Sequence, residues 1–135
     1  MAYRTILVGL DDSDGMAGRA AFALALAGHW QARLIGLLAN PFPFMPTSLG
    51  EGAAYAGPEI MEAQEQANAA RTARIRAVFE ALPVPEGVSR HFIVDEGAPG
   101  DSVSAHARTA DLTIVGQSHG EGLEAVAMEH AEQIV

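Results

Sequence analysis

The chain has 135 residues, of which 49% are hydrophobic, and it contains no cysteine. This length suits one domain, here residues 1–135, and the lack of cysteine excludes disulfides, thiolate metal sites and a cysteine nucleophile. Seventeen acidic residues against eight basic ones give a formal net charge of −9, so we expect no binding to nucleic acid or to anionic membranes.

No apolar run approaches the roughly 20 residues of a membrane span, and the first residues lack the basic and then apolar pattern of a signal peptide. We therefore expect a soluble, cytoplasmic protein.

The first half of the chain alternates between strand and helix patterns. Residues 5–10 form an apolar run typical of a strand that is covered on both faces. Residues 14–30 predict a helix that is largely buried, because its core, residues 20–27, is apolar all round, and residues 33–39 predict a second strand. A loop rich in proline and glycine is predicted over 41–57. Pro58 suits the first position of the next helix, which is predicted to end near Leu82.

The second half repeats this alternation, with a strand predicted over 88–95, a helix over 99–108, a strand over 111–115 and a helix over 122–135. The whole pattern predicts an α/β fold with an open parallel sheet and helices on both faces, of Rossmann-like type. Ligands in such sheets bind beyond the carboxyl ends of the strands, where the strand order reverses. The four predicted strand ends, which we expect to line one crevice, are residues 11–13, 39–40, 95–97 and 116–120.

A glycine-rich turn from Gly116 to Gly122 connects the last strand to the last helix. Glycines in this position let the backbone approach a phosphate, although they also suit a plain tight turn. There is no P-loop lysine, and the acidic residues that follow the turn oppose a polyphosphate. The turn also reads Gly-x-Ser-x-Gly around Ser118. Because no acid and histidine follow from later strand ends, we expect chance spacing rather than a hydrolase, and an enzyme is the less favoured class.

Asp11, Asp12 and Ser13 follow the first strand. Ser13 or Asp12 can cap the next helix, which leaves Asp11 for a ribose hydroxyl or a metal–phosphate group. His119, in the glycine-rich turn, is a candidate for ligand contact or for a response to pH. The other histidines have no metal-site spacing, so we expect no metal site; they are His29, His91, His106 and His130.

Two stretches carry a resemblance to a known family. Residues 3–13, which read YRTILVGLDDS, look like the opening strand and acidic turn of universal stress proteins. Residues 96–116 are similar to the family signature "G-x-P … A … A-D-L-hydrophobic-hydrophobic-G". The resemblance spans the whole chain and implies the fold of that family.

The nucleotide-binding members of the family carry Gly-x-x-Gly, nine further residues, and then Gly-Ser or Gly-Thr. Gly116 matches the first glycine, His119 stands at the second with Gly120 displaced by one position, and Met128-Glu129 stand where Gly-Ser is expected. The resemblance therefore implies a crevice that is biased against a triphosphate.

The family's first-strand aspartate maps to Asp11, and the backbone position at the adenine edge maps near Ala39. The adenosine half of the site is thus expected to survive, with ATP or AMP as the candidate ligand. The complete set of candidate ligand-binding residues is Asp11, Asp12, Ser13, Ala39, Gly116, Ser118, His119, Gly120 and Gly122.

Relatives continue into a fifth strand, which we expect to be missing here or to be supplied elsewhere. The chain would then be truncated, or be the first half of a tandem protein, or have its sheet edge completed by a partner, so a homodimer or a tandem-domain partner is expected. The leading function is a non-enzymatic stress-response protein that acts through dimerisation and weak adenine-nucleotide binding. The alternatives are an ATP-binding switch with slow hydrolysis, and a small-molecule sensor that uses the same crevice.

Overall fold

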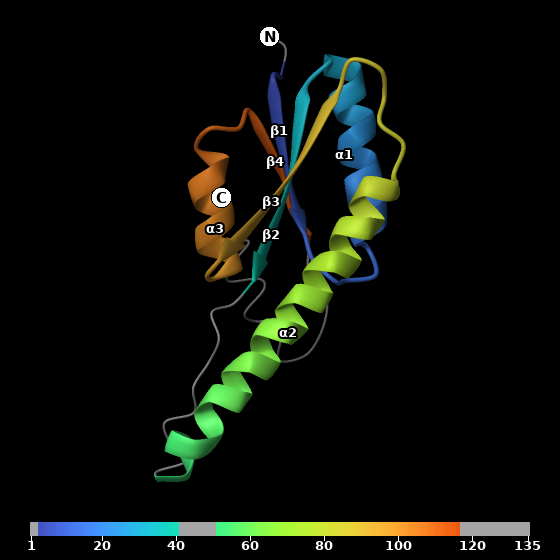
Figure 1. Cartoon of the computed structure of the whole chain (residues 1–135). Coiled ribbons are helices and arrows are strands. Elements are labelled where there is room, and N and C mark those ends of the chain that lie inside the picture. Colours follow the sequence, from blue (N-terminus) through green and yellow to red (C-terminus); the bar gives the residue numbers. More distant parts are fainter. Residues whose placement is uncertain (1–2, 41–50, 117–135) are drawn as a thin grey trace.

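The computed structural model describes residues 3–40 and 51–116, with the side chains of 51–56 left out. Helices and strands alternate along this part of the chain (Figure 1). Their bounds are β1 (Thr5–Leu10), α1 (Met16–Trp30), β2 (Arg33–Asn40), α2 (Glu51–Ala81), β3 (Ser89–Glu96), α3 (Pro99–Ala107) and β4 (Leu112–Ile114). The predicted α/β class is confirmed, and the three predicted helices and four predicted strands that fall here are all present.

The four strands form one parallel sheet in the order β3-β2-β1-β4. The chain moves outward from β1 to β2 and β3, and then returns to place β4 on the other side of β1. Leu7 is accordingly paired with Ile35 of β2 on one side and with Thr113 of β4 on the other. The strand order therefore reverses between β1 and β4, and this boundary is where an open parallel sheet forms its ligand crevice.

Helices cover both faces of the sheet, with α1 and α2 on one face and α3 on the other (Figure 1). Alternate residues of β1 enter two separate cores, because successive side chains of a strand point to opposite faces. Ile6 and Val8 pack toward α1 and α2, whereas Leu7 packs with Leu37 and with Val103 of α3.

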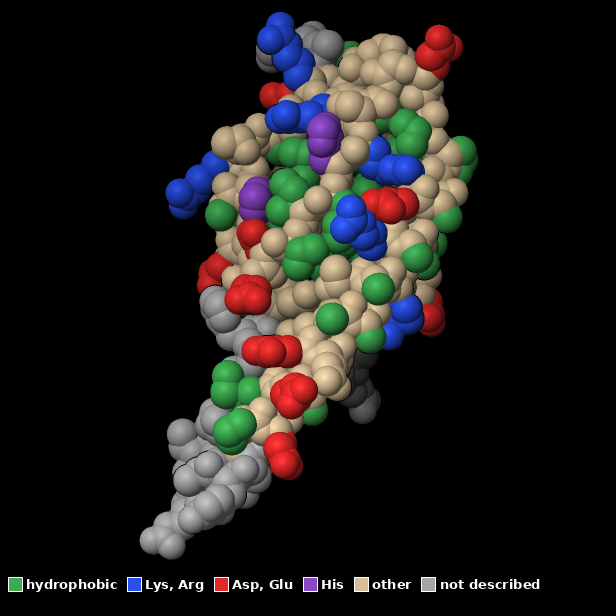
Figure 2. Space-filling model, viewed as in Figure 1, with side chains coloured by type: hydrophobic (Ala, Val, Ile, Leu, Met, Phe, Trp, Pro, Cys, Tyr) green, Lys and Arg blue, Asp and Glu red, His purple; other side chains and the backbone are tan. Residues whose placement is uncertain are grey.

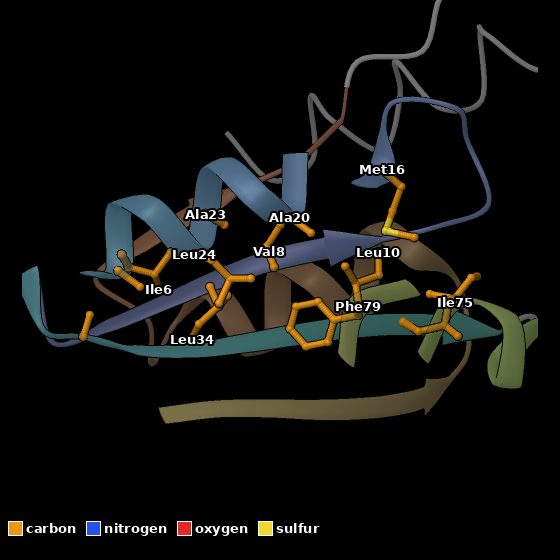
Figure 3. Close-up of a cluster of buried hydrophobic side chains, with 13 residues drawn as sticks. Ile6, Val8, Leu10, Met16, Ala20, Ala23, Leu24, Leu34, Ile75 and Phe79 are labelled. Atoms are coloured by element: carbon orange, nitrogen blue, oxygen red, sulfur yellow. The ribbon is translucent and has the colours of Figure 1, made fainter. Parts of the chain in front are cut away.

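Phe79 of α2 is the largest fully buried side chain among the described residues, and its ring lies over the sheet beside Leu10 (Figure 3). Gly36 of β2 has no side chain and so leaves room for the Phe79 ring. A Cβ atom at residue 36 would lie 2.8 Å from both the Phe79 ring and Leu10 Cδ1. Glycine in the middle of β2 is therefore required by the close approach of an aromatic ring.

Asp111 joins β4 to β1 at the amino end of the sheet. One of its carboxylate oxygens, Oδ2, accepts the backbone N–H groups of Arg4 and Thr5 at 2.8 and 2.9 Å. These two hydrogen bonds hold the pKa of Asp111 below its ordinary value. The backbone N–H of Asp111 donates in return to the Thr5 carbonyl at 2.9 Å.

The predicted burial of the first helix was wrong, because α1 buries one face and exposes the other. Phe22, on the outer face, is 60% exposed. Alanine favours a helix whether or not it is buried, so the alanine-rich sequence did not distinguish a covered helix from a half-covered one. The buried residues of α1 are Met16, Ala20, Ala23, Leu24 and Ala27.

The predicted start of the second helix was also wrong. The helix begins at Glu51, so Pro58 lies inside it and residues 51–57 are not loop. A proline removes one backbone hydrogen bond and crowds the preceding turn, which weakens or kinks a helix without necessarily ending it. The other predicted ends agree with the structure to within about two residues. The predicted loop at 41–50 and the predicted helix at 122–135 lie outside the described residues.

None of the helices in the described part combines the length and the apolar character that crossing a bilayer requires.

Replacement of Phe79 by Ala is expected to lower the free energy of unfolding by about 3–5 kcal/mol, because it empties a fully enclosed position. Phe22→Ala is the matched control: it removes the same atoms from an exposed position and is expected to cost less than about 1 kcal/mol. Urea unfolding of both variants, followed by circular dichroism, measures the difference. Equal losses would contradict the packing described here.

Candidate functional site

Asp11 follows β1 directly and folds the chain into a tight turn. Its Oδ1 atom accepts the backbone N–H of Ser13 at 2.9 Å and also the Ser13 hydroxyl. This is the turn that aspartate forms when it bonds to the backbone two residues further on. Its second oxygen, Oδ2, accepts the Nη2 atom of Arg19 at 2.9 Å.

Arg19, in the first turn of α1, reaches back to the carboxyl end of β1. Its Nε atom donates to the Gly9 carbonyl at 3.0 Å while Nη2 holds Asp11. The Arg19 side chain is only 12% exposed. One guanidinium thus fixes the backbone of β1, the acidic turn and the start of α1 relative to each other.

The pKa of Asp11 reflects this environment. Partial burial raises it, but the hydrogen bonds from Ser13 and the positive charge of Arg19 together outweigh burial and hold the pKa below its ordinary value. Asp11 is therefore a carboxylate at neutral pH and acts only as an acceptor of hydrogen bonds.

The predicted capping of α1 by Ser13 or Asp12 was wrong. The residue that caps the helix is Gly15, and no side chain bonds to the helix start. The N–H of Met16 donates instead to the Ser13 carbonyl at 3.2 Å. Asp11 forms its turn with Ser13, and α1 begins only at Met16. Asp12 and Ser13 therefore lie before the capping position, which is Gly15. Both oxygens of Asp11 already accept hydrogen bonds, two on Oδ1 and one on Oδ2, so only Oδ2 keeps an acceptor position for a ligand.

A second polar network joins the ends of β1 and β2 to α2. Asn40, the buried last residue of β2, donates from Nδ2 to Thr72 Oγ1 at 2.8 Å and accepts Arg71 Nη1 on Oδ1 at 2.6 Å. Arg71 also contacts Asp12, with Nε and Oδ2 3.2 Å apart. Gly97, just after β3, donates its N–H to the Asn40 carbonyl at 2.8 Å. Asn40 therefore locks three consecutive elements together.

Gly116, the first residue of the glycine-rich turn, lies against Arg19. A Cβ atom at residue 116 would stand 2.0 Å from Arg19 Nη1 and 2.9 Å from Cζ. Glycine at this position thus leaves room for the guanidinium. This is a structural reason for the glycine, in addition to the predicted approach of a phosphate. The contact brings the ends of β1 and β4 together at the reversal of strand order.

The structure therefore places four predicted site residues around one end of the sheet: Asp11, Asp12, Ser13 and Gly116. Ala39 is buried in β2 and paired with Asp95 of β3, one residue beyond the last pair of β2 with β1. The remaining candidates lie outside the described residues and stay predictions; they are Ser118, His119, Gly120 and Gly122.

The predicted strand end at 95–97 does not join this crevice. Strand β3 lies at the far edge of the sheet, separated by β2 from the boundary between β1 and β4. Asp95 contacts α3 instead, with Oδ2 2.7 Å from His106 Nε2. A strand end reaches the crevice only if the strand is central, and strand order is a property of the fold that no local pattern reveals.

Two hollows lie near the carboxyl ends. The first, of about 240 Å³, is bounded by residues 11–14, Met16 and Ala17 on one side and by Arg74, Ile75 and Val78 on the other. The second, of about 670 Å³, lies between α2 and the end of β3 and includes Asn40, Met61, Thr72, Arg76 and Val94.

Acidic side chains follow one another along the part of α2 that extends beyond the sheet (Figure 2). Glu59, Glu62 and Glu65 are all exposed there. This arm repels polyanions and accords with the strongly negative net charge of the chain.

Sequence reasoning missed Arg19 and Arg71, and it placed Asn40 at the crevice only as the end of a predicted strand. Within the described residues, these three side chains make most of the polar contacts at this end. One signal for this network is present in the sequence: Asn40 ends an apolar strand, and a buried amide must find hydrogen-bond partners.

The model of the universal stress protein family matches residues 2–135. The chain belongs to the universal stress protein family. Among curated protein sequences there is no match. The match to the family model confirms the resemblance inferred from residues 3–13 and 96–116.

Solved structures show the same fold. Universal stress protein UspA from Lactobacillus plantarum is 20% identical, with a TM-score of 0.69, over 100% of this chain and 92% of its own. A universal stress protein in complex with cAMP is 24% identical, with a TM-score of 0.50, over 98% and 91%. A universal stress protein from Archaeoglobus fulgidus in complex with dAMP is 15% identical, with a TM-score of 0.50, over 99% and 90%.

Replacement of Asp11 by Asn is expected to lower the free energy of unfolding at pH 7, because the variant loses the carboxylate that Ser13 and Arg19 stabilise. The Asp11 side chain is 41% exposed, so the loss is expected to be only about 1 kcal/mol. The native pKa of Asp11 is depressed, so its contribution is complete above the unfolded pKa of about 4 and disappears as the pH falls through the native value.

Urea unfolding at pH 7, 5, 4 and 3 measures this difference between wild type and variant. Asp14→Asn, in the same turn but with no hydrogen bond to Ser13 or Arg19, is the control and is expected to show a smaller effect. A difference that grows as the pH falls would contradict the depressed pKa of Asp11.

Proposed function

We propose that this universal stress protein is a non-enzymatic binding protein that takes up an adenine nucleotide weakly at the carboxyl ends of β1 and β4. The observation that carries the proposal is Asp11, an ionised carboxylate fixed where the strand order reverses. Its Oδ1 accepts two hydrogen bonds from Ser13, whereas Oδ2 accepts one from Arg19. A carboxylate oxygen has about two acceptor positions, so Oδ2 can accept one more donor, such as a ribose hydroxyl.

The similar structures support adenine as the base. One is a universal stress protein in complex with cAMP, and another is a universal stress protein in complex with dAMP. These ligands are bound by those two proteins. The two bound nucleotides and the position of Asp11 beside the reversal of strand order together make adenine nucleotides the first ligands to test for this chain.

The local charge argues against ATP as the preferred ligand. Asp11, Asp12 and Asp14 all border the hollow at the end of β1. Arg74 borders the same hollow, and Arg19 and Arg71 pair with Asp11 and Asp12, so the end of β1 has no net positive charge that would hold a triphosphate. Weak binding of a nucleotide with fewer phosphates is the proposal that agrees with this arrangement.

A nucleophilic enzyme needs a hydroxyl or thiol held against a base. In residues 3–40 and 57–116, no serine or threonine hydroxyl is hydrogen-bonded to a histidine ring; the ring of His106 contacts Asp95. We therefore propose binding, rather than catalysis, as the role of the crevice.

Dimerisation is the second part of the proposal. Strand β4 is the outer strand beside β1, and within the described residues its other edge has no strand partner. An unpaired edge is a template for another strand, from a second copy or from a tandem domain. Sedimentation velocity of the 14.1 kDa chain tests this part, and a single species of monomer mass across micromolar concentrations would contradict it.

Isothermal titration with adenosine, AMP and ATP, with and without magnesium, tests the binding. We expect AMP to bind with a Kd on the order of 0.1 mM, and Asp11→Ala to weaken both adenosine and AMP by about tenfold through loss of the ribose acceptor. Glu86→Ala removes the same charge from the amino-end side of β3, and is expected to leave binding unchanged.

Failure of all three adenine compounds to bind would contradict the proposal. ATP binding at least about tenfold tighter than AMP would instead support an ATP-binding switch, which the local charge disfavours.

A further inference from the structure

Arg19 holds its guanidinium at the reversal of strand order, and within the described residues part of its donor capacity is unused. Arginine has five N–H donors, of which Nε serves Gly9 and one on Nη2 serves Asp11. Among residues 3–40 and 51–116, Nη1 has no hydrogen-bond partner. This atom lies beside Gly116, just past the end of β4. The unused edge of the guanidinium is thus located where β1 and β4 end together.

The position of Arg19 is enforced rather than incidental. Its side chain is largely buried, it is held at two atoms, and Gly116 leaves room for it. A donor that is already held in place loses little conformational entropy when a ligand binds, which strengthens recognition. The planar fork of arginine also matches two oxygens of a phosphate at once.

We propose that Arg19 recognises the phosphate of the crevice ligand and makes this site selective for a nucleotide with a single phosphate group. The inference rests on the proposed adenine-nucleotide binding and assigns a role that the glycine-rich turn alone would otherwise fill. Asp11 accepts the ribose hydroxyl through Oδ2, and Arg19 donates from Nη1 to the phosphate. Arg19 and Asp11 bond to each other, so this one contact positions both side chains.

The charge count disfavours a polyphosphate, because the groups at the end of β1 have no surplus of positive charge. Three carboxylates and three guanidiniums meet around the end of β1, so their formal charges of −3 and +3 sum to zero; they are Asp11, Asp12, Asp14, Arg19, Arg71 and Arg74. One phosphate adds one or two negative charges beside Arg19. A triphosphate adds at least about three, with no further cation among these groups to balance them.

The experiment compares the affinities of adenosine, AMP, cAMP and ATP for wild type and for Arg19→Gln by isothermal titration. In wild type, AMP and cAMP are expected to bind roughly 10- to 100-fold more tightly than adenosine, and ATP no more tightly than AMP. In Arg19→Gln this preference for a phosphate is expected to vanish, while adenosine affinity changes less than about threefold. The AMP and cAMP arms separate a terminal phosphate from a phosphodiester.

Arg33→Gln is the control, because it removes the same charge from an exposed side chain at the amino end of β2, away from the candidate site. It is expected to keep the preference for AMP over adenosine. Arg19→Lys retains the charge without the fork and is expected to keep part of the preference. This variant, together with the side-chain ¹⁵N signals of Arg19 in the wild-type chain on addition of AMP, decides the question if Arg19→Gln does not fold.

Equal loss of adenosine and AMP in Arg19→Gln would show that Arg19 only positions Asp11, and would overturn the proposal while leaving adenine binding intact. Equal affinity of wild type for adenosine and AMP would also overturn it. An absence of binding by adenosine itself, by AMP and by cAMP contradicts the proposed function and this inference together.

Discussion

The contact between Arg19 and the end of β1 determines the arrangement of the whole carboxyl-end region. Its Nε and Nη2 atoms hold the Gly9 carbonyl and Asp11, and its guanidinium lies against Gly116. The acidic turn, the start of α1 and the end of β4 are thereby placed relative to one another by one side chain. That region is where the strand order reverses, so the same contact lies at the candidate site.

Strand β1 is fixed to β4 at both ends by a charged group. Asp111 accepts the N–H groups of Arg4 and Thr5 at the amino end, and Arg19 holds the carboxyl end. Between them, only three residue pairs join the two strands. A boundary with so short a ladder depends on its terminal contacts, which explains why polar groups gather there while the centre of β1 is wholly apolar.

The network around Asn40 has a comparable role one strand away. Asn40, Arg71 and Thr72 connect the end of β2 to α2, so the long helix is attached to the sheet by partly buried hydrogen bonds as well as by Ile75 and Phe79. Burying an amide is costly unless its hydrogen bonds are made, and here both polar atoms of the Asn40 side chain have partners. The requirement for these partners fixes where α2 passes the sheet.

Much of the fold could be predicted from the sequence, because the strands are apolar runs bounded by turn residues and each run gives its own signal. Asp11 could be predicted too, since an acidic residue directly after a central strand lies at the crevice in any parallel sheet of this kind. The partners of Asp11 could not. Arg19 is eight residues away, and whether it faces β1 or solvent depends on where α1 begins, which the Asp11 turn itself decides.

Errors arose where a local rule competed with the tertiary structure. Proline is frequent at the first position of helices, yet α2 continues through Pro58. The alanine-rich segment of α1 has the composition of a buried helix, yet only one of its faces meets the sheet. The end of β3 carries acidic residues like the end of β1, but strand order places it at the far edge. Each of these outcomes depends on neighbours that are distant in the sequence.

The central claim, that the ligand site lies at the reversal of strand order, is tested most directly by backbone amide spectra recorded while AMP is added to the ¹⁵N-labelled chain. The account predicts that chemical-shift changes concentrate at residues 9–13 and 115–116, around Arg19 and its partners. Changes confined instead to Met61, Thr72 and Val94, which border the larger hollow between α2 and β3, would contradict it.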